Sequence, residues 1–99
     1  MYYNKKKISK REKCHRVLNL YCNSLSYHAE VLGNGDMTFE DFKYDVFGLL
    51  ESLKRYVTAN KKLVSEPAIR KLNAINLNEY KNSDLALLAI DGLSRTLKN

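Results

Sequence analysis

The chain has few of the residues that make turns: its 99 residues include one proline and four glycines. Glycine and proline dominate tight turns, so this scarcity argues against a loop-rich fold or a β fold with many turns. Long apolar runs are also missing. The longest, residues 85–90, is far shorter than the roughly 20 residues of a membrane-spanning helix, and the basic N-terminus lacks the apolar stretch that a secretory signal needs. These absences predict a small helical domain located in the cytoplasm.

Cysteine is scarce as well, with Cys14 and Cys22 eight residues apart in a segment of helical periodicity. Eight residues of α-helix span about 12 Å, which is too far for a disulfide, and reduced thiols are typical of the cytoplasm. With His15 and His28 these cysteines suggest zinc, but four side chains leaving one helix in different directions do not converge as tetrahedral ligands. We therefore expect no metal and no other cofactor.

The first predicted helix covers residues 9–32. Ser9 followed by Glu12 matches a capping box, and Gly33-Asn34-Gly35 is a typical helix stop. Between them, apolar residues recur at helical spacing along one face: Cys14, Val17, Leu18, Tyr21, Leu25, His28 and Leu32. The second predicted helix, 38–59, begins at Thr38 as N-cap. It contains all three phenylalanines, so we expect it to anchor the core.

Two shorter helices are predicted at 66–75, with Ser65 as N-cap and Pro67 in the first turn, and at 84–97. The asparagine-rich segment 76–83 is either a loop or an early start of the last helix. No strand-like alternation is present. The predicted fold class is all-α, a small antiparallel bundle of about four helices (9–32, 38–59, 66–75, 84–97). Residues 1–8 are predicted as a flexible basic N-terminal arm, and 9–99 as a single helical domain.

Two helices carry more apolar surface than one small bundle hides. A second strip on the first helix lies beside its core face, and the last helix is apolar around most of its circumference. We expect such surplus surface to be covered by another chain, and we predict a homodimer. The predicted dimer or partner interface comprises Leu20, Tyr27, Val31, Leu87 and Ile90.

The net charge of +6 comes entirely from the N-terminal segment. Residues 1–16 hold seven basic side chains and one acidic one, residues 30–51 sum to −5, and residues 54–99 sum to +5. A dense basic segment can follow a phosphate backbone, can bind an anionic membrane or an acidic protein, or can serve solubility alone. The residues predicted to bind nucleic acid or another anionic partner are Lys5, Lys6, Lys7, Lys10, Arg11, Lys13 and Arg16.

The turn between the first two helices resembles the twelve-residue calcium loop of an EF-hand. The stretch from Glu30 to Asp41 has Gly35 at the sixth position, as that loop requires. It departs from the pattern in lacking an oxygen ligand at Leu32, the third position, and in ending on Asp41 rather than a long bidentate glutamate. The degenerate candidate ligands are Glu30, Asn34, Asp36, Thr38 and Asp41, and a plain helix–helix turn explains the same residues.

No catalytic constellation is recognisable, so an enzyme is not expected. The sequence favours a small regulatory protein that binds another macromolecule. Its ten asparagines and many lysines suggest a low-GC source, and we expect an accessory protein of a bacterium, plasmid or phage. The main alternative is a nucleic-acid-binding protein that uses the basic N-terminal segment. A second alternative is a protein similar in size, charge and helix count to the small helical immunity proteins of bacteriocin producers, although no motif carries this analogy.

Overall fold

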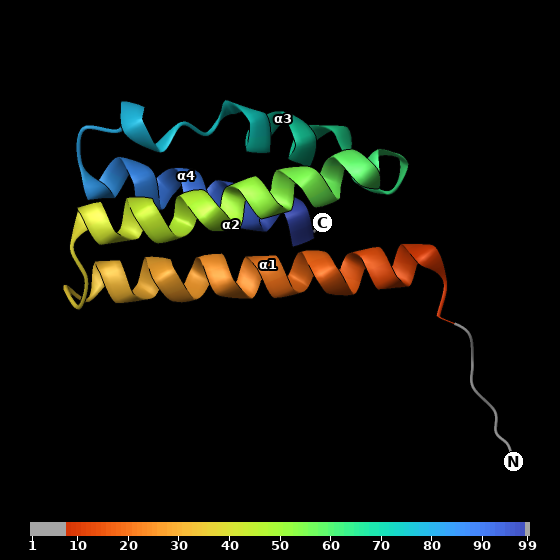
Figure 1. Cartoon of the computed structure of the whole chain (residues 1–99), viewed down its shortest axis with the longest axis horizontal. Coiled ribbons are helices and arrows are strands. Elements are labelled where there is room, and N and C mark those ends of the chain that lie inside the picture. The colour runs from red at the N-terminus through yellow and green to blue at the C-terminus, as the bar shows by residue number, and fades with distance from the viewer. Residues whose placement is uncertain (1–7, 99) are drawn as a thin grey trace, which may run out of the picture.

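The computed structural model describes residues 8–98, which form four α-helices and two short 3-10 helices (Figure 1). The predicted all-α fold class is confirmed, and each predicted helix begins and ends within one residue of the observed bounds. Of the predicted arm, only Ile8 belongs to the described residues. The elements are α1 (Lys10–Gly33), α2 (Phe39–Ala59), η1 (Lys61–Leu63), α3 (Glu66–Ala74), η2 (Leu77–Glu79) and α4 (Ser83–Lys98).

Successive helices run antiparallel, so that α1 lies antiparallel to both α2 and α4 (Figure 1). The most extensive packing joins α1 to α4, followed by α1 to α2, and α3 covers α4. The first and last helices of the chain are therefore neighbours. Within residues 8–98, no helix combines the length and the apolar character needed to cross a bilayer.

Side-chain caps explain where the helices begin. The hydroxyls of Ser9, Thr38 and Ser65 each accept a hydrogen bond from the backbone N–H three residues later, which satisfies one of the unpaired donors of a helix start. All three N-caps were predicted. The turn after α1 contains Gly35, whose φ of +79° is readily adopted by glycine alone.

The segment between α3 and α4 is a connection rather than an early part of α4. The Asn76 side chain accepts a hydrogen bond from the Asn78 amide and supports the single turn η2. The Asn82 side chain then accepts from the Leu85 amide at 3.1 Å, as an N-cap does for a helix. Two asparagines thus divide this segment into a short turn and a new helix start.

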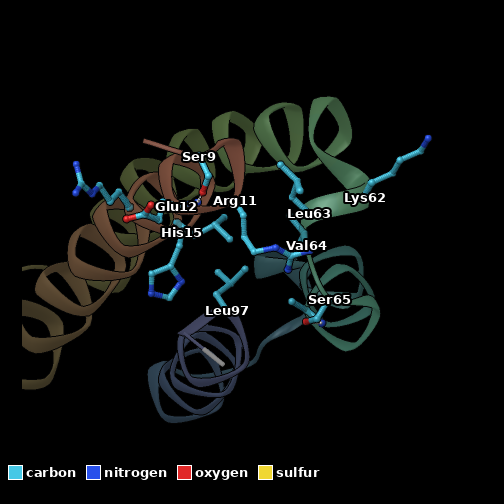
Figure 2. Close-up of a pocket in the computed structure, with 12 residues that line it drawn as sticks. Ser9, Arg11, Glu12, His15, Lys62, Leu63, Val64, Ser65 and Leu97 are labelled. Atoms are coloured by element: carbon cyan, nitrogen blue, oxygen red, sulfur yellow. Dashed lines mark hydrogen bonds between the residues drawn. The ribbon is translucent and has the colours of Figure 1, made fainter. Parts of the chain in front are cut away.

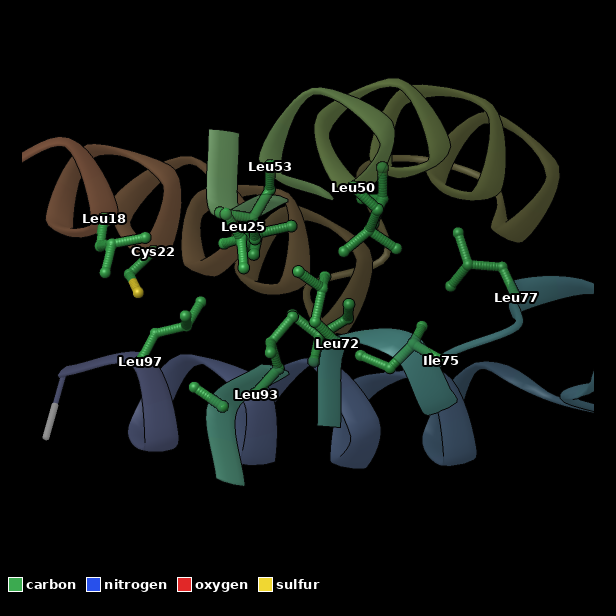
Figure 3. Close-up of a cluster of buried hydrophobic side chains, with 14 of the residues drawn as sticks. Leu18, Cys22, Leu25, Leu50, Leu53, Leu72, Ile75, Leu77, Leu93 and Leu97 are labelled. Carbon is green, nitrogen blue, oxygen red and sulfur yellow. The ribbon is translucent and has the colours of Figure 1, made fainter. Parts of the chain in front are cut away.

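The core runs along the axis of the bundle and draws on every α-helix (Figure 3). Leu25, Phe42, Leu53 and Leu93 are fully buried in it. Of the three phenylalanines of α2, Phe42 is fully buried and Phe39 packs against the core, whereas Phe47 is 57% exposed. Phe47 lies five residues after Phe42, which corresponds to about 140° around the helix and carries its ring away from the core.

Candidate functional site

The predicted anion-binding residues are only partly covered by the structure. Lys5, Lys6 and Lys7 lie outside the described residues. The other four, Lys10, Arg11, Lys13 and Arg16, lie on the first two turns of α1 and are exposed. None of these four forms an ion pair with a carboxylate of residues 8–98.

A shallow, open pocket of about 570 Å³ lies beside them, where the start of α1, η1, the start of α3 and the end of α4 meet (Figure 2). Arg11 extends from α1 across this pocket toward Val64, and Lys62 of η1 reaches into solvent at its edge (Figure 2). His15 and Leu97 close another side. Basic groups from two separate segments of the chain thereby share one depression.

Sequence reasoning missed the contribution of η1 and of the end of α4. Lys61, Lys62 and Lys98 are exposed at this end of the bundle, next to pocket residues. The positive net charge of residues 54–99 indicated that this part of the chain is basic, but only the tertiary fold brings these lysines close to the start of α1. We call this surface the basic end, consisting of Lys10, Arg11, Lys13, Arg16, Lys61, Lys62 and Lys98.

Two helix starts add to the positive potential of the basic end. Ser9 and Ser65, the N-caps of α1 and α3, both line the pocket. Helix N-termini carry partial positive charge and favour anions. Glu12 is the only acidic side chain among the pocket-lining residues, so the combined potential attracts anions.

The other end of the bundle is acidic. Glu30 lies in the last turn of α1, Asp36 in the α1–α2 turn, and Glu40 and Asp41 in the first turn of α2. Lys43 pairs with Glu40 at 2.9 Å, which neutralises only part of this charge. The turn lies at the end of α1 (Figure 1) and the pocket at its start, so the charge is separated along the long axis.

The five candidate calcium ligands lie in and next to the α1–α2 turn. The Thr38 hydroxyl caps α2, and the backbone N–H of Asn34 donates to the backbone carbonyl of Glu30 at the end of α1. Within residues 8–98, no group of three or more His, Cys, Asp or Glu side chains is placed to hold a metal ion. The local arrangement is that of a capped helix–helix turn.

The predicted interface residues are found in different environments. Leu20 and Tyr27 of α1 are 66% and 64% exposed, and Val31 and Leu87 are half-buried. Including Ile90 was wrong, because it is 1% exposed and belongs to the core. Most of the apolar circumference of α4 is explained by its two neighbours, α1 and α3, while Leu85 and Leu88 stay exposed.

The cysteines are buried structural groups. Both are free thiols, as predicted, and the Cys22 thiol donates to the Ser94 carbonyl at 3.6 Å. Burial raises the pKa of Cys22, against a smaller opposing effect of the Lys98 charge. Desolvation also raises the pKa of Tyr56, with a further contribution from its hydrogen bond with Cys14. A raised thiol pKa and burial disfavour nucleophilic chemistry.

A second groove, of about 960 Å³, lies between α2 and the α3–η2 segment. Tyr44 and Phe47 expose their rings on its α2 side. Its charged lining residues are Asp45 and the two ion pairs Lys43–Glu40 and Lys54–Glu51. The sequence did not predict this groove, because it depends on how α2 packs against the α3–η2 segment.

Comparison of the chain with protein-family models, curated proteins and solved structures gave no match.

Proposed function

We propose that this protein is a non-enzymatic regulatory protein that binds another macromolecule through its basic end, and that the partner is a nucleic acid held by its phosphates. The observation that carries the proposal is that Arg11 and Lys62 both border one pocket. These residues are remote in sequence, and neither has an ion-pair partner among residues 8–98. The free thiols support a reducing compartment such as the cytoplasm.

The chemistry of the basic end favours phosphates over a protein surface. Protein interfaces take most of their binding energy from a few buried apolar or aromatic anchors. Among the described residues, the large exposed apolar side chains lie away from the pocket, except for Ile8 next to Ser9. Lysine, arginine and helix N-termini are the groups that contact phosphates without reading bases. The expected binding is independent of base sequence and sensitive to salt.

A fluorescence anisotropy titration tests this proposal with labelled single-stranded DNA, duplex DNA and RNA. About four phosphate contacts predict an affinity loss on the order of 100-fold between about 50 and about 200 mM salt. The full chain should bind at low salt and lose affinity along that slope. Absence of binding at low salt, or binding that is independent of salt, would contradict the proposal.

A matched pair of charge reversals tests the location of the site. Lys62→Glu changes the basic end, whereas Lys81→Glu makes the same change on an exposed lysine between η2 and α4. We expect Lys62→Glu to weaken binding by about tenfold and Lys81→Glu to have a much smaller effect. Equal effects would show that net charge alone governs binding.

The competing partners are tested with the same proteins. Vesicles with anionic headgroups and polyglutamate offer negative charge without a nucleic-acid backbone. Stronger binding to either of these than to DNA or RNA at equal salt would reject a nucleic acid as the partner, although the basic end could still be the binding surface.

A further inference from the structure

The outward side of α1 carries an apolar strip that neither α2 nor α4 covers. Leu20 and Tyr27 are its centre, each about two-thirds exposed and seven residues apart. Seven residues correspond to two helical turns, so both side chains leave the helix in nearly the same direction. Val31 continues the strip one turn further and is half-buried.

The contacts of α1 show why this strip is left outside. Tyr21 meets Ser52 and Tyr56 of α2, and Cys22 meets Ser94 of α4. Leu20 lies next to Tyr21 on the side away from Cys22, because successive side chains are rotated by about 100°. The faces toward α2 and α4 are thus occupied, and the strip lies beyond the α2 contact.

Charged residues of opposite sign lie at the two ends of the strip. Arg16 precedes Leu20 by one turn, and Glu30 follows Tyr27 by one turn. Both are exposed and have no ion-pair partner among residues 8–98. The order along the helix is therefore basic, apolar, apolar, acidic.

We propose that a second copy of this chain packs on the strip with its α1 antiparallel, related by a two-fold axis near Asn23. In this register Leu20 packs against Tyr27 of the second copy, and Arg16 lies opposite Glu30 of the second copy. The two-fold axis repeats both pairs, as expected of an isologous interface. The antiparallel arrangement also sets the basic end of each copy beside the acidic end of the other.

Other arrangements fit this surface less well. A parallel α1 pair would place Arg16 against Arg16 and Glu30 against Glu30 of the second copy, which is repulsive. The Tyr27 ring is already held edge-on by His28, with ring centres 5.6 Å apart. His28 is itself fixed by its Nδ1 contact with the Ser24 carbonyl at 2.8 Å. Preorganised anchors reduce the entropy lost on binding.

Analytical ultracentrifugation over a range of micromolar concentrations tests the association. The expected result is a concentration-dependent rise toward twice the monomer mass of 11.5 kDa. Leu20→Glu should weaken the dimer by about tenfold or more, since it places a charge in the apolar centre. The control is Leu88→Glu, the same change at a 69% exposed leucine of α4, which should leave the dimer intact. Circular dichroism checks that both variants are folded.

Charge exchange tests the proposed pairing. Arg16→Glu should weaken the dimer by bringing two acidic side chains together, and Arg16→Glu combined with Glu30→Arg should restore it. A wild-type chain that stays at the monomer mass, a dimer that survives Leu20→Glu, or a double variant as weak as Arg16→Glu would each overturn the proposal.

Cysteine cross-linking tests the register, because the native thiols are buried. Asn23→Cys should form an intermolecular disulfide on mild oxidation, since it lies beside the proposed axis. Arg16→Cys should not, because two copies of position 16 would be about 21 Å apart along the antiparallel helices. Cross-linking at position 16, as a parallel pair would give, overturns the antiparallel arrangement.

Discussion

The hydroxyls of Tyr21 on α1 and Ser52 on α2 are joined by a hydrogen bond between two helices whose other contacts there are largely apolar. The Tyr56 ring lies beside it, with its centre 6.4 Å from that of Tyr21. A directional bond in such a seam fixes the sliding and rotation of one helix against the other, which apolar contacts alone specify less sharply.

Tyr21→Phe removes this bond and keeps the ring. We expect a loss of about 1 kcal/mol in the free energy of unfolding, because the Ser52 hydroxyl is left partly buried without its partner. Urea denaturation measures the loss. Tyr44→Phe is the control, since that ring is on the surface and its hydroxyl has no hydrogen bond among residues 8–98. A double-mutant cycle with Ser52→Ala should give a coupling near the single-variant value, and additive effects would contradict the assignment.

Gly48 lies in the middle of α2, and a Cβ atom built there meets no atom within 4 Å. Glycine costs a helix interior about 1 kcal/mol relative to alanine, so Gly48→Ala should stabilise the protein by up to that amount. Gly35→Ala should have the opposite effect, since φ is +79° at that position. Thermal denaturation of both variants checks the two signs, and a destabilised Gly48→Ala protein would contradict the prediction.

Stability should fall at high pH because of Cys22. Its pKa is raised above 9.0 by burial, so the folded protein retains a proton that the unfolded chain has already lost. Stability then decreases as the pH rises through about 9. Comparing unfolding free energies near neutral pH and near pH 10 should show a smaller loss for Cys22→Ala than for the wild type. Equal losses would assign the effect to other groups.

Asn82 is expected to determine where α4 begins, because its side chain accepts from the Leu85 amide. Asn82→Ala should cost about 1 kcal/mol, as N-cap removal usually does. Asn78→Ala is the matched control: Asn78 is exposed, and its own hydrogen bond uses the backbone amide. Chemical denaturation of the two variants provides the comparison, and similar stabilities would argue against Asn82 as a cap.

Helix positions could be predicted here because the signals are local. Ser9, Thr38 and Ser65 act on amides three residues away, and the spacing of apolar residues follows the helical period. Neither depends on what the helix packs against. The same local information could not place the neighbours of each helix, so Ile90 was assigned to an interface although it belongs to the core.

The candidate site depends on contacts between distant parts of the chain. The positive charge of the first turns of α1 could be predicted directly from the sequence. The contribution of Lys62 and Lys98 could not, because only the tertiary fold brings η1 and the end of α4 to the start of α1. Arg16 and Glu30 are an intermediate case. Helical spacing predicts that they share one strip of α1, but only the structure shows that the centre of this strip is exposed.

The packing of α1 against α4 has a consequence for how the protein is made. During synthesis α1 emerges before its most extensive partner, the 16-residue α4. Until α4 emerges, the buried face of α1 is covered only in part, and the nascent chain remains open to chaperones and to other chains. The four-helix bundle is therefore completed only after α4 has been synthesised, and chains truncated before α4 should be targets for proteolysis.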